Sequence, residues 1–121
     1  MGLDSEFHDP TDYERRLIDR LLSVPFQGRD QVRDQARSAR VRWISNAAAP
    51  ALIIQPSAES KTANVSTRVP TDATGRDSDG GEIFFLLHVV DGRLSEIEVY
   101  RGDGEPIQKF PPPETVKVMN Y

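Results

Sequence analysis

The stretch that decides the fold is IFFLLHVVDGRLSEIEVY, residues 83–100. Two strand-like runs, 83–90 and 93–100, are separated only by Asp91-Gly92. A two-residue Asp-Gly connection favours a type I′ hairpin, because glycine accepts the positive φ of that turn and the turn matches the twist of the strands. The sequence therefore predicts an antiparallel hairpin at the centre of a sheet.

Counting outward from this turn predicts which side chains share a face of the hairpin. A straight register places His88 opposite Ser95 and Leu86 opposite Ile97. One face is then wholly apolar and is expected to lie under a helix: Phe84, Leu86, Ile97 and Val99. The other face combines apolar and acidic residues: Ile83, Phe85, Leu87, Val89, Glu96 and Glu98. That face is too apolar to meet water and too acidic to be core throughout, so another segment or a partner should cover it.

An N-terminal helix is predicted between Thr11 and Pro25. TDYE, residues 11–14, has the form of a capping box, with a hydroxyl at the N-cap and a glutamate three residues later. The apolar positions that follow form one stripe at the helical period: Tyr13, Leu17, Ile18, Leu21 and Leu22. A second, weaker helix over residues 30–39 has few apolar positions and should lie on the surface.

Further strands are predicted from short apolar and β-branched runs at residues 41–44, 51–54, 65–69 and 115–119, the last as an edge strand. Residues 71–81, rich in Asp, Gly, Ser and Thr, are expected to form a loop. Because the helices precede most of the strands, we expect an α+β fold, with one or two N-terminal helices packed on a mainly antiparallel sheet of four to six strands. Residues 1–10 are expected to form a flexible arm, and residues 11–121 a single domain.

The composition excludes several classes of protein. The chain has 121 residues, no cysteine and a net charge of −4, so it has no disulfide framework, thiolate metal site or cysteine nucleophile. No apolar run approaches the length of a membrane span, and no secretory signal opens the chain, which indicates a cytoplasmic protein. The acidic balance argues against a nucleic-acid binder. The basic concentration at Arg29, Arg33, Arg37, Arg40 and Arg42 is interpreted as a solvated helix face, because neighbouring aspartates pair with it.

Two features could carry chemistry. The loop from Asp72 to Glu82 gathers carboxylates and glycines, as calcium loops do, but it lacks the ligand order of an EF-hand and also fits an ordinary turn. His88 could act as a base or a ligand, yet no cysteine and no second histidine lies nearby, so no metal site and no cofactor is predicted. A Ser95-His88-acid triad would lack the usual nucleophile turn, and a core histidine with satisfied hydrogen bonds is the preferred interpretation.

Glu96 and Glu98 alternate along one strand, which puts their side chains on one face about 6–7 Å apart. Three interpretations stay open for this pair. The carboxylates could be catalytic, as in glycosidases, although no cleft of aromatic residues accompanies them. They could form an acidic contact surface for a basic partner, or they could simply be solvated.

Three stretches carry a resemblance to known proteins: VPTDA (69–73), DSDG (77–80) and the run from Ile83 to Gly104. Together they resemble the C-terminal half of a family of small bacterial proteins of unknown function, which also open with a glutamate-containing helix. The resemblance covers most of residues 13–118 and is specific over 69–107. The chain departs from it at Gly102, where an acidic residue is usual, and in the loop 56–64. The resemblance implies a compact α+β domain of the bacterial cytoplasm and transfers no catalytic residue.

These observations predict a non-catalytic protein–protein interaction module, and its most concrete version is the immunity protein of a bacterial toxin. The residues expected to bind the partner are Glu96, Glu98, Asp103, Phe85 and Leu87. The acidic members would meet a basic protein surface, and their charge would speed association. One alternative is a small-molecule or metal-binding domain, or an enzyme, that uses the Asp72–Glu82 loop and His88. Another is a homo-oligomer that buries the Phe85-Leu87 face on itself.

Overall fold

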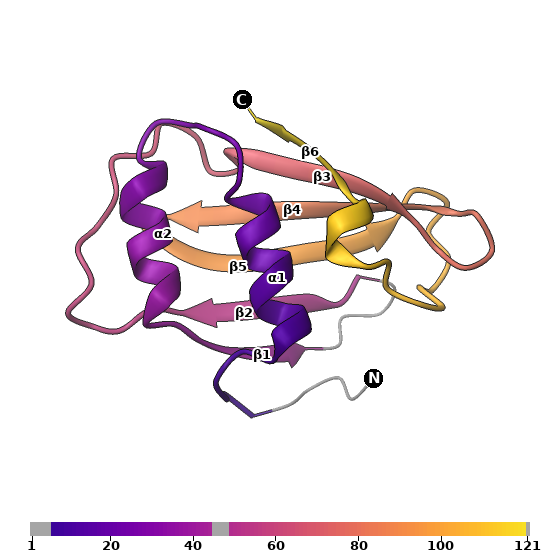
Figure 1. Cartoon of the computed structure of the whole chain (residues 1–121), viewed down its shortest axis with the longest axis horizontal. Coiled ribbons are helices and arrows are strands. Elements are labelled where there is room, and N and C mark those ends of the chain that lie inside the picture. The colour runs from indigo at the N-terminus through magenta and orange to yellow at the C-terminus, as the bar shows by residue number, and fades with distance from the viewer. Residues whose placement is uncertain (1–5, 45–48, 121) are drawn as a thin grey trace.

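The computed structural model describes residues 6–44 and 49–120. Two α-helices lie on one face of a six-stranded antiparallel sheet, so the predicted α+β fold is confirmed (Figure 1). The elements are α1 (Asp12–Leu21), α2 (Arg29–Arg37), β1 (Arg40–Ile44), β2 (Ala51–Gln55), β3 (Thr71–Arg76), β4 (Glu82–Val90), β5 (Arg93–Arg101), the 3-10 helix η1 (Pro113–Thr115) and β6 (Lys117–Asn120). The strands are ordered β1-β2-β5-β4-β3-β6. No helix among the described residues combines the length and apolar character needed to cross a membrane.

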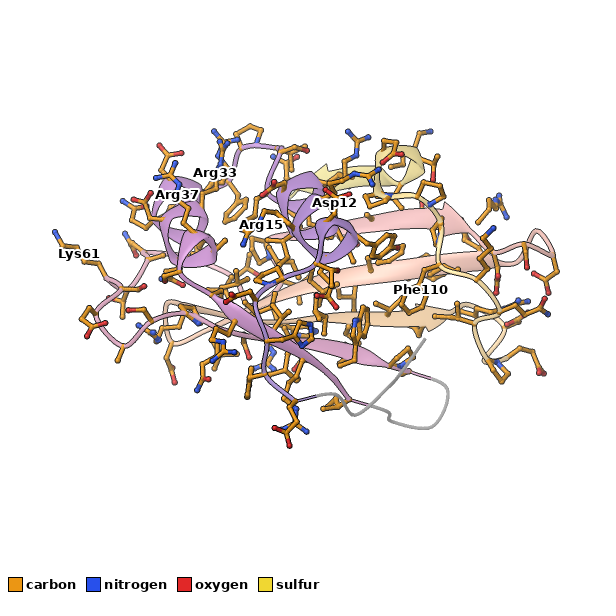
Figure 2. The ribbon with its side chains drawn as sticks, turned by 60° about the horizontal axis from the view of Figure 1, so that its bottom comes forward. Asp12, Arg15, Arg33, Arg37, Lys61 and Phe110 are labelled. Carbon is orange, nitrogen blue, oxygen red and sulfur yellow. The ribbon has the colours of Figure 1, made fainter. Side chains whose placement is uncertain are left out.

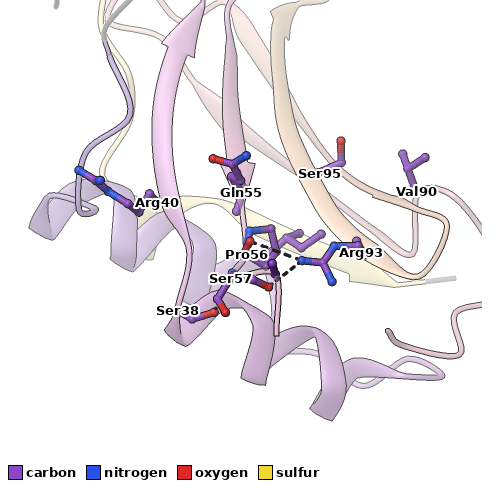
Figure 3. Close-up of a pocket in the computed structure, with 11 residues that line it drawn as sticks. Ser38, Arg40, Gln55, Pro56, Ser57, Val90, Arg93 and Ser95 are labelled. Carbon is purple, nitrogen blue, oxygen red and sulfur yellow. Dashed lines mark hydrogen bonds between the residues drawn. The ribbon is translucent and has the colours of Figure 1, made fainter. Parts of the chain in front are cut away.

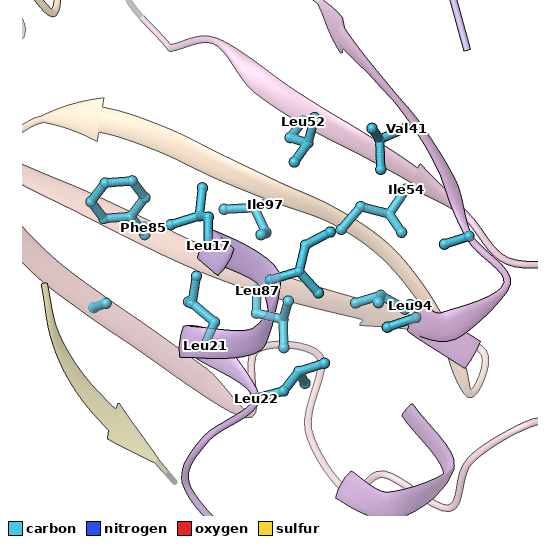
Figure 4. Packing of buried hydrophobic residues seen from close by; sticks show 14 of the residues in the cluster. Leu17, Leu21, Leu22, Val41, Leu52, Ile54, Phe85, Leu87, Leu94 and Ile97 are labelled. Carbon is cyan, nitrogen blue, oxygen red and sulfur yellow. The ribbon is translucent and has the colours of Figure 1, made fainter. Parts of the chain in front are cut away.

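The predicted capping box opens α1. The Thr11 hydroxyl accepts a hydrogen bond from the Glu14 amide (3.2 Å), and the Glu14 carboxylate accepts one from the Thr11 amide (2.9 Å). The apolar stripe of the helix then packs on the sheet: Leu17 and Leu21 are fully buried beside Phe85, Leu87 and Ile97 (Figure 4). Burial of such side chains contributes about 1.5–3 kcal/mol each, which holds α1 on the sheet.

The hairpin turn is confirmed, with φ of 51° at Asp91 and 75° at Gly92. The straight register is wrong beyond the first two pairs. Val90 pairs with Arg93 and Val89 with Leu94, but the register then shifts, so that His88 pairs with Glu96 and Ser95 is left over. This irregularity is a β-bulge, in which two residues of one strand oppose one residue of the other.

The bulge follows from the spacing of apolar residues in β5. Leu94 and Ile97 are three positions apart, so a regular strand would point them to opposite faces. The extra residue brings both side chains to the helix-facing side, where they are 1 % and 0 % exposed. The burial of two large apolar side chains outweighs the disruption of one rung of the ladder.

The shift exchanges the two faces that a straight register predicts. Phe85 and Leu87 were expected on a face for a partner or a second copy, but both are 0 % exposed and belong to the core. Their prediction as surface contacts is therefore wrong. Phe84 and Leu86, expected under a helix, lie instead on the face that carries Glu96 and Glu98, as the pairing of Leu86 with Glu98 shows.

The third predicted strand was also misplaced. Residues 65–69 form no strand, although the carbonyl of Arg68 accepts a hydrogen bond from the Val89 amide (2.8 Å). The strand lies instead at Thr71–Arg76, in the segment predicted as a loop. Its weak strand propensity is overridden because β4 and β6 pair with it on both sides. Gly75 suits this position, since a Cβ atom there would lie 3.0 Å from the Pro111 ring.

The predicted flexible arm is partly attached to the sheet. His8 exchanges two backbone hydrogen bonds of 2.9 Å with Val41, at the outer edge of β1. The flexibility expected for residues 1–10 is therefore wrong at His8, and residues 1–5 lie outside the described residues. The other predicted strands and the second helix are confirmed close to their expected positions.

Candidate functional site

The sheet has a second face, turned away from both α-helices, which we call the open face (Figure 1). The strand register assigns its residues in three rows across the sheet. One row is Arg42, Ile53, Glu96 and His88; the next is Ile44, Ala51, Glu98, Leu86, Asp72 and Met119; the third is Tyr100, Phe84, Thr74 and Lys117. Apolar and charged side chains therefore alternate within one surface.

An apolar cluster occupies one side of the open face. The rings of Phe84 and Tyr100 stack with centroids 5.3 Å apart and planes at 21°. Leu86 follows on the same strand, and all three side chains remain partly exposed. Met119, further along the row of Leu86, is 55 % exposed, which is unusual for a large apolar side chain.

Charged groups lie beside this cluster. Nε2 of His88 and Oε1 of Glu98 are 2.9 Å apart, and Nε of Arg68 donates to Nδ1 of His88 (3.0 Å). Because Nδ1 accepts, the ring proton lies on Nε2 and is donated to Glu98. The Glu96 carboxylate makes no hydrogen bond or ion pair with the rest of the described chain. His88 thus has both ring nitrogens satisfied, as predicted, but it faces Glu98 on the open face and not Ser95 in the core.

Asp103, also expected to meet a partner, belongs to a different cluster at the far end of the hairpin. It binds Arg101 with both carboxylate oxygens, at 3.0 Å from Nε and 2.7 Å from Nη2. The hydrogen bonds from Arg101 lower the pKa of Asp103 to about 2. Nη1 of the same arginine also binds Asp77 (3.0 Å) and Asp79 (2.9 Å). Arg101 is only 6 % exposed, so Asp103 is tied into the fold and does not adjoin Glu96 and Glu98.

The loop considered for a metal is organised around this arginine. Burial raises the pKa of the Asp77 carboxyl, but amide hydrogen bonds from Gln108, Lys109 and Ser78, together with Arg101, outweigh burial and hold that pKa far below its ordinary value. The guanidinium therefore occupies the centre that a cation would need. Within residues 6–44 and 49–120, no group of three or more His, Asp or Glu side chains is arranged to hold a metal. Asp72, the other end of the proposed loop, lies in β3 on the open face.

The sequence pattern of DUF6984, described as a domain of unknown function, matches residues 8–111. The chain belongs to this family. The match takes in α1, α2 and strands β1 to β5, and it confirms the predicted relationship to a family of unknown function. No curated protein and no solved structure matches the sequence. Gly102, the departure noted in the sequence, lies against the open face of this DUF6984 domain: a Cβ atom there would be 3.0 Å from the Phe84 ring.

The basic residues of the DUF6984 domain do not form one surface. Arg33 and Arg37 lie on α2, on the helix side of the molecule with Arg15 (Figure 2). Arg37 pairs with Asp34 (2.8 Å), whereas Arg42 lies on the opposite side of the sheet, 5.6 Å from the centre of the Phe7 ring. The local pairing inferred from the sequence is therefore present for Arg37.

Sequence reasoning missed the residues that distinguish the open face, above all Phe84, Leu86 and Tyr100. Glu96 and Glu98 were placed correctly on a common face, but with the wrong apolar neighbours. The signal was available in the odd spacing of Leu94 and Ile97, which a bulge accommodates.

Proposed function

We propose that this DUF6984 domain is a non-catalytic protein-interaction module that binds its partner through the open face. The observation that carries the proposal is the apolar cluster of Phe84, Leu86 and Tyr100, which lies beside Glu96 and Glu98 on a face that no described helix covers. Clustered apolar side chains with a charged border are typical of protein interaction sites, where aromatic anchors contribute much of the affinity.

The charges favour a partner that presents basic side chains around an apolar centre. Among the described residues, the Glu96 carboxylate has no partner, and the Glu98 carboxylate accepts a hydrogen bond only from His88. With a net charge of −4, the chain would also attract a basic protein during diffusional encounter. A bacterial toxin neutralised by its immunity protein is the most specific pairing of this kind, and we propose it as the first partner class to test.

The geometry around His88 supports a non-catalytic role. A general base needs a free nitrogen directed at a substrate, but Arg68 and Glu98 take both nitrogens of His88. Ser95 lies in the bulge and is not paired with His88. A serine–histidine mechanism would therefore require a rearrangement of β5.

The experiment is capture of the tagged protein's partner from its host lysate, with mass spectrometry and then calorimetric titration of the purified pair. We expect a stoichiometric basic partner that is lost on Glu96→Lys/Glu98→Lys and on Tyr100→Ser. The matched control is Glu105→Lys, a charge reversal at an exposed position outside the open face. Circular dichroism must show the same fold in every variant.

Two results would overturn the proposal. A partner that binds the double charge reversal as tightly as the wild type would show that another surface makes the contact. A second copy of the chain as the only partner, detected by gel filtration, would assign the open face to self-association.

A further inference from the structure

A hollow of about 770 Å³ lies where the ends of β2 and β5 separate (Figure 3). The two strands pair from Ala51↔Glu98 to Ile53↔Glu96, and no pair follows toward the hairpin turn. Gln55 on β2 and Ser95 on β5 lie on either side of the hollow, and Arg93 also lines it, with its guanidinium turned toward Pro56 and Ser57 (Figure 3). The volume lies in the range of small-molecule sites, about 300–1,000 Å³.

Arg93 gives the hollow an uncompensated positive charge. Its Nη1 donates to the Ser60 carbonyl (3.0 Å), and its Nη2 to the carbonyls of Ser57 (2.8 Å) and Pro56 (3.4 Å). These partners are neutral, and Arg93 forms no ion pair with any described carboxylate, whereas Arg101 binds three aspartates. A guanidinium has five N–H groups and three of them are used, which leaves two without an acceptor among the described residues.

The rest of the lining suits an anion with an apolar body. The Ser95 hydroxyl and the Gln55 amide make no hydrogen bond with the described residues, so both can bind a ligand. None of the described residues that line the hollow is Asp or Glu, although acidic residues outnumber basic ones by 19 to 15 in the chain. Ile54, Leu94 and Val90 supply apolar walls.

From this arrangement we infer that the hollow binds a small organic anion, a carboxylate or a phosphate. Arg93 would bind its charged group, and the side chains of Gln55 and Ser95 would bind its other polar atoms. The backbone carbonyls of residues 56–60 hold the guanidinium in place before the ligand arrives, which lowers the entropic cost of binding. This site is independent of the proposed partner surface, since Glu96, Glu98 and Tyr100 do not line it.

The test is an NMR titration of the ¹⁵N-labelled protein with two probes, inorganic phosphate and benzoate, at constant ionic strength. We expect saturable shifts confined to Gln55, Val90, Arg93 and Ser95. Tighter binding of benzoate would identify a carboxylate with an apolar body, and tighter binding of phosphate would identify a phosphate group. Ser95→Ala and Gln55→Ala should each weaken the affinity about two- to tenfold, the effect of one hydrogen bond.

Arg93→Gln should abolish saturation. Arg33→Gln on the exposed face of α2 is the matched control with the same change of charge, and it should leave binding unchanged. If Arg93→Gln disturbs the loop, the Ser95→Ala and Gln55→Ala variants still decide the question. Shifts that never saturate, or equal losses in Arg33→Gln and Arg93→Gln, would overturn the inference.

Discussion

The buried carboxylate of Glu14 offers the sharpest test of how the helix layer is attached to the sheet. Its side chain is 6 % exposed and accepts three hydrogen bonds. Oε1 accepts from the Thr11 amide (2.9 Å) and from Nε2 of His8 (2.9 Å), and Oε2 accepts from the Trp43 indole (2.8 Å). One carboxylate thus joins the start of α1, strand β1 and the segment that precedes the helix.

Glu14→Gln keeps the shape of this side chain but replaces one acceptor oxygen with an amide donor. If the remaining oxygen serves Thr11 and His8, the new amide group faces the Trp43 indole, and this buried donor loses its acceptor. An unsatisfied buried donor costs about 1–3 kcal/mol, and the other hydrogen bonds lose the part of their strength that depends on charge. We expect the free energy of unfolding to fall by about 2–4 kcal/mol, a large share of the about 5–15 kcal/mol typical of a domain.

Urea denaturation followed by circular dichroism measures this change in the free energy of unfolding. The control is Asp12→Asn, the same acid-to-amide change in the same helical turn, where the carboxylate is 87 % exposed and pairs only with Arg16 among the described residues. Asp12→Asn should lower the free energy of unfolding by less than about 0.5 kcal/mol. In a Trp43→Phe background, Glu14→Gln should lower the free energy of unfolding by less than it does in the wild type, because the indole N–H that would lose its acceptor is absent. Equal losses for Glu14→Gln and Asp12→Asn would refute the reasoning.

Further predictions concern pH, the two sheet faces and the hairpin end. Both ring nitrogens of His8 face acceptors, and the hydrogen bonds to the Glu6 carbonyl and then to Glu14 raise the pKa of His8 above 6.5. The stability that the charged His8 contributes is therefore fully present below about pH 6.5 and is lost as pH rises through the higher pKa of the folded state. Hydrogen exchange of the Val41 amide should accelerate over that interval beyond its intrinsic pH dependence. Phe85→Ala should lower the free energy of unfolding by about 3–5 kcal/mol and Phe84→Ala by less than half as much, measured by urea denaturation; the reverse order would support the straight register. The buried Gln35 side chain donates to the carbonyls of Lys61 and Gly92 and accepts from the Leu94 amide, and Gln35→Met removes these hydrogen bonds. Hydrogen exchange of the Leu94 amide should therefore accelerate sharply, while exchange in β1 should not.

Local signals predicted the parts of the fold that depend on neighbours in sequence. The capping box of Thr11 and Glu14 and the Asp91-Gly92 turn each need only a few adjacent residues, and both formed as expected. Residues 71–76 could not be recognised in this way, because Asp72 and Gly75 are poor strand residues. That strand exists because β4 and β6 offer it hydrogen bonds on both sides, which a local pattern does not contain.

The composition of the open face depends on a one-residue shift in the register between β4 and β5. A slip of one position moves every later side chain to the other face. Ser95 produces such a slip, so Glu96 and Glu98 gained Phe84 and Leu86 as neighbours in place of Phe85 and Leu87. Asp103 lies in a separate cluster for a different reason: its side chain binds Arg101, which is buried at the end of β5, and charge counting along the chain does not reveal which arginine is buried.

The apolar pattern of β4 favours a partner that covers the open face. A strand with one solvated face alternates between apolar and polar residues, whereas a strand buried on both faces reads as a continuous apolar run. β4 reads IFFLL over residues 83–87, with Ile83, Phe85 and Leu87 in the core and Phe84 and Leu86 on the open face. The helices complete only the first of these faces (Figure 1). Phe84 and Leu86 therefore add little to the core that α1 closes, and a partner seated on the open face would give them the burial that their strand pattern implies.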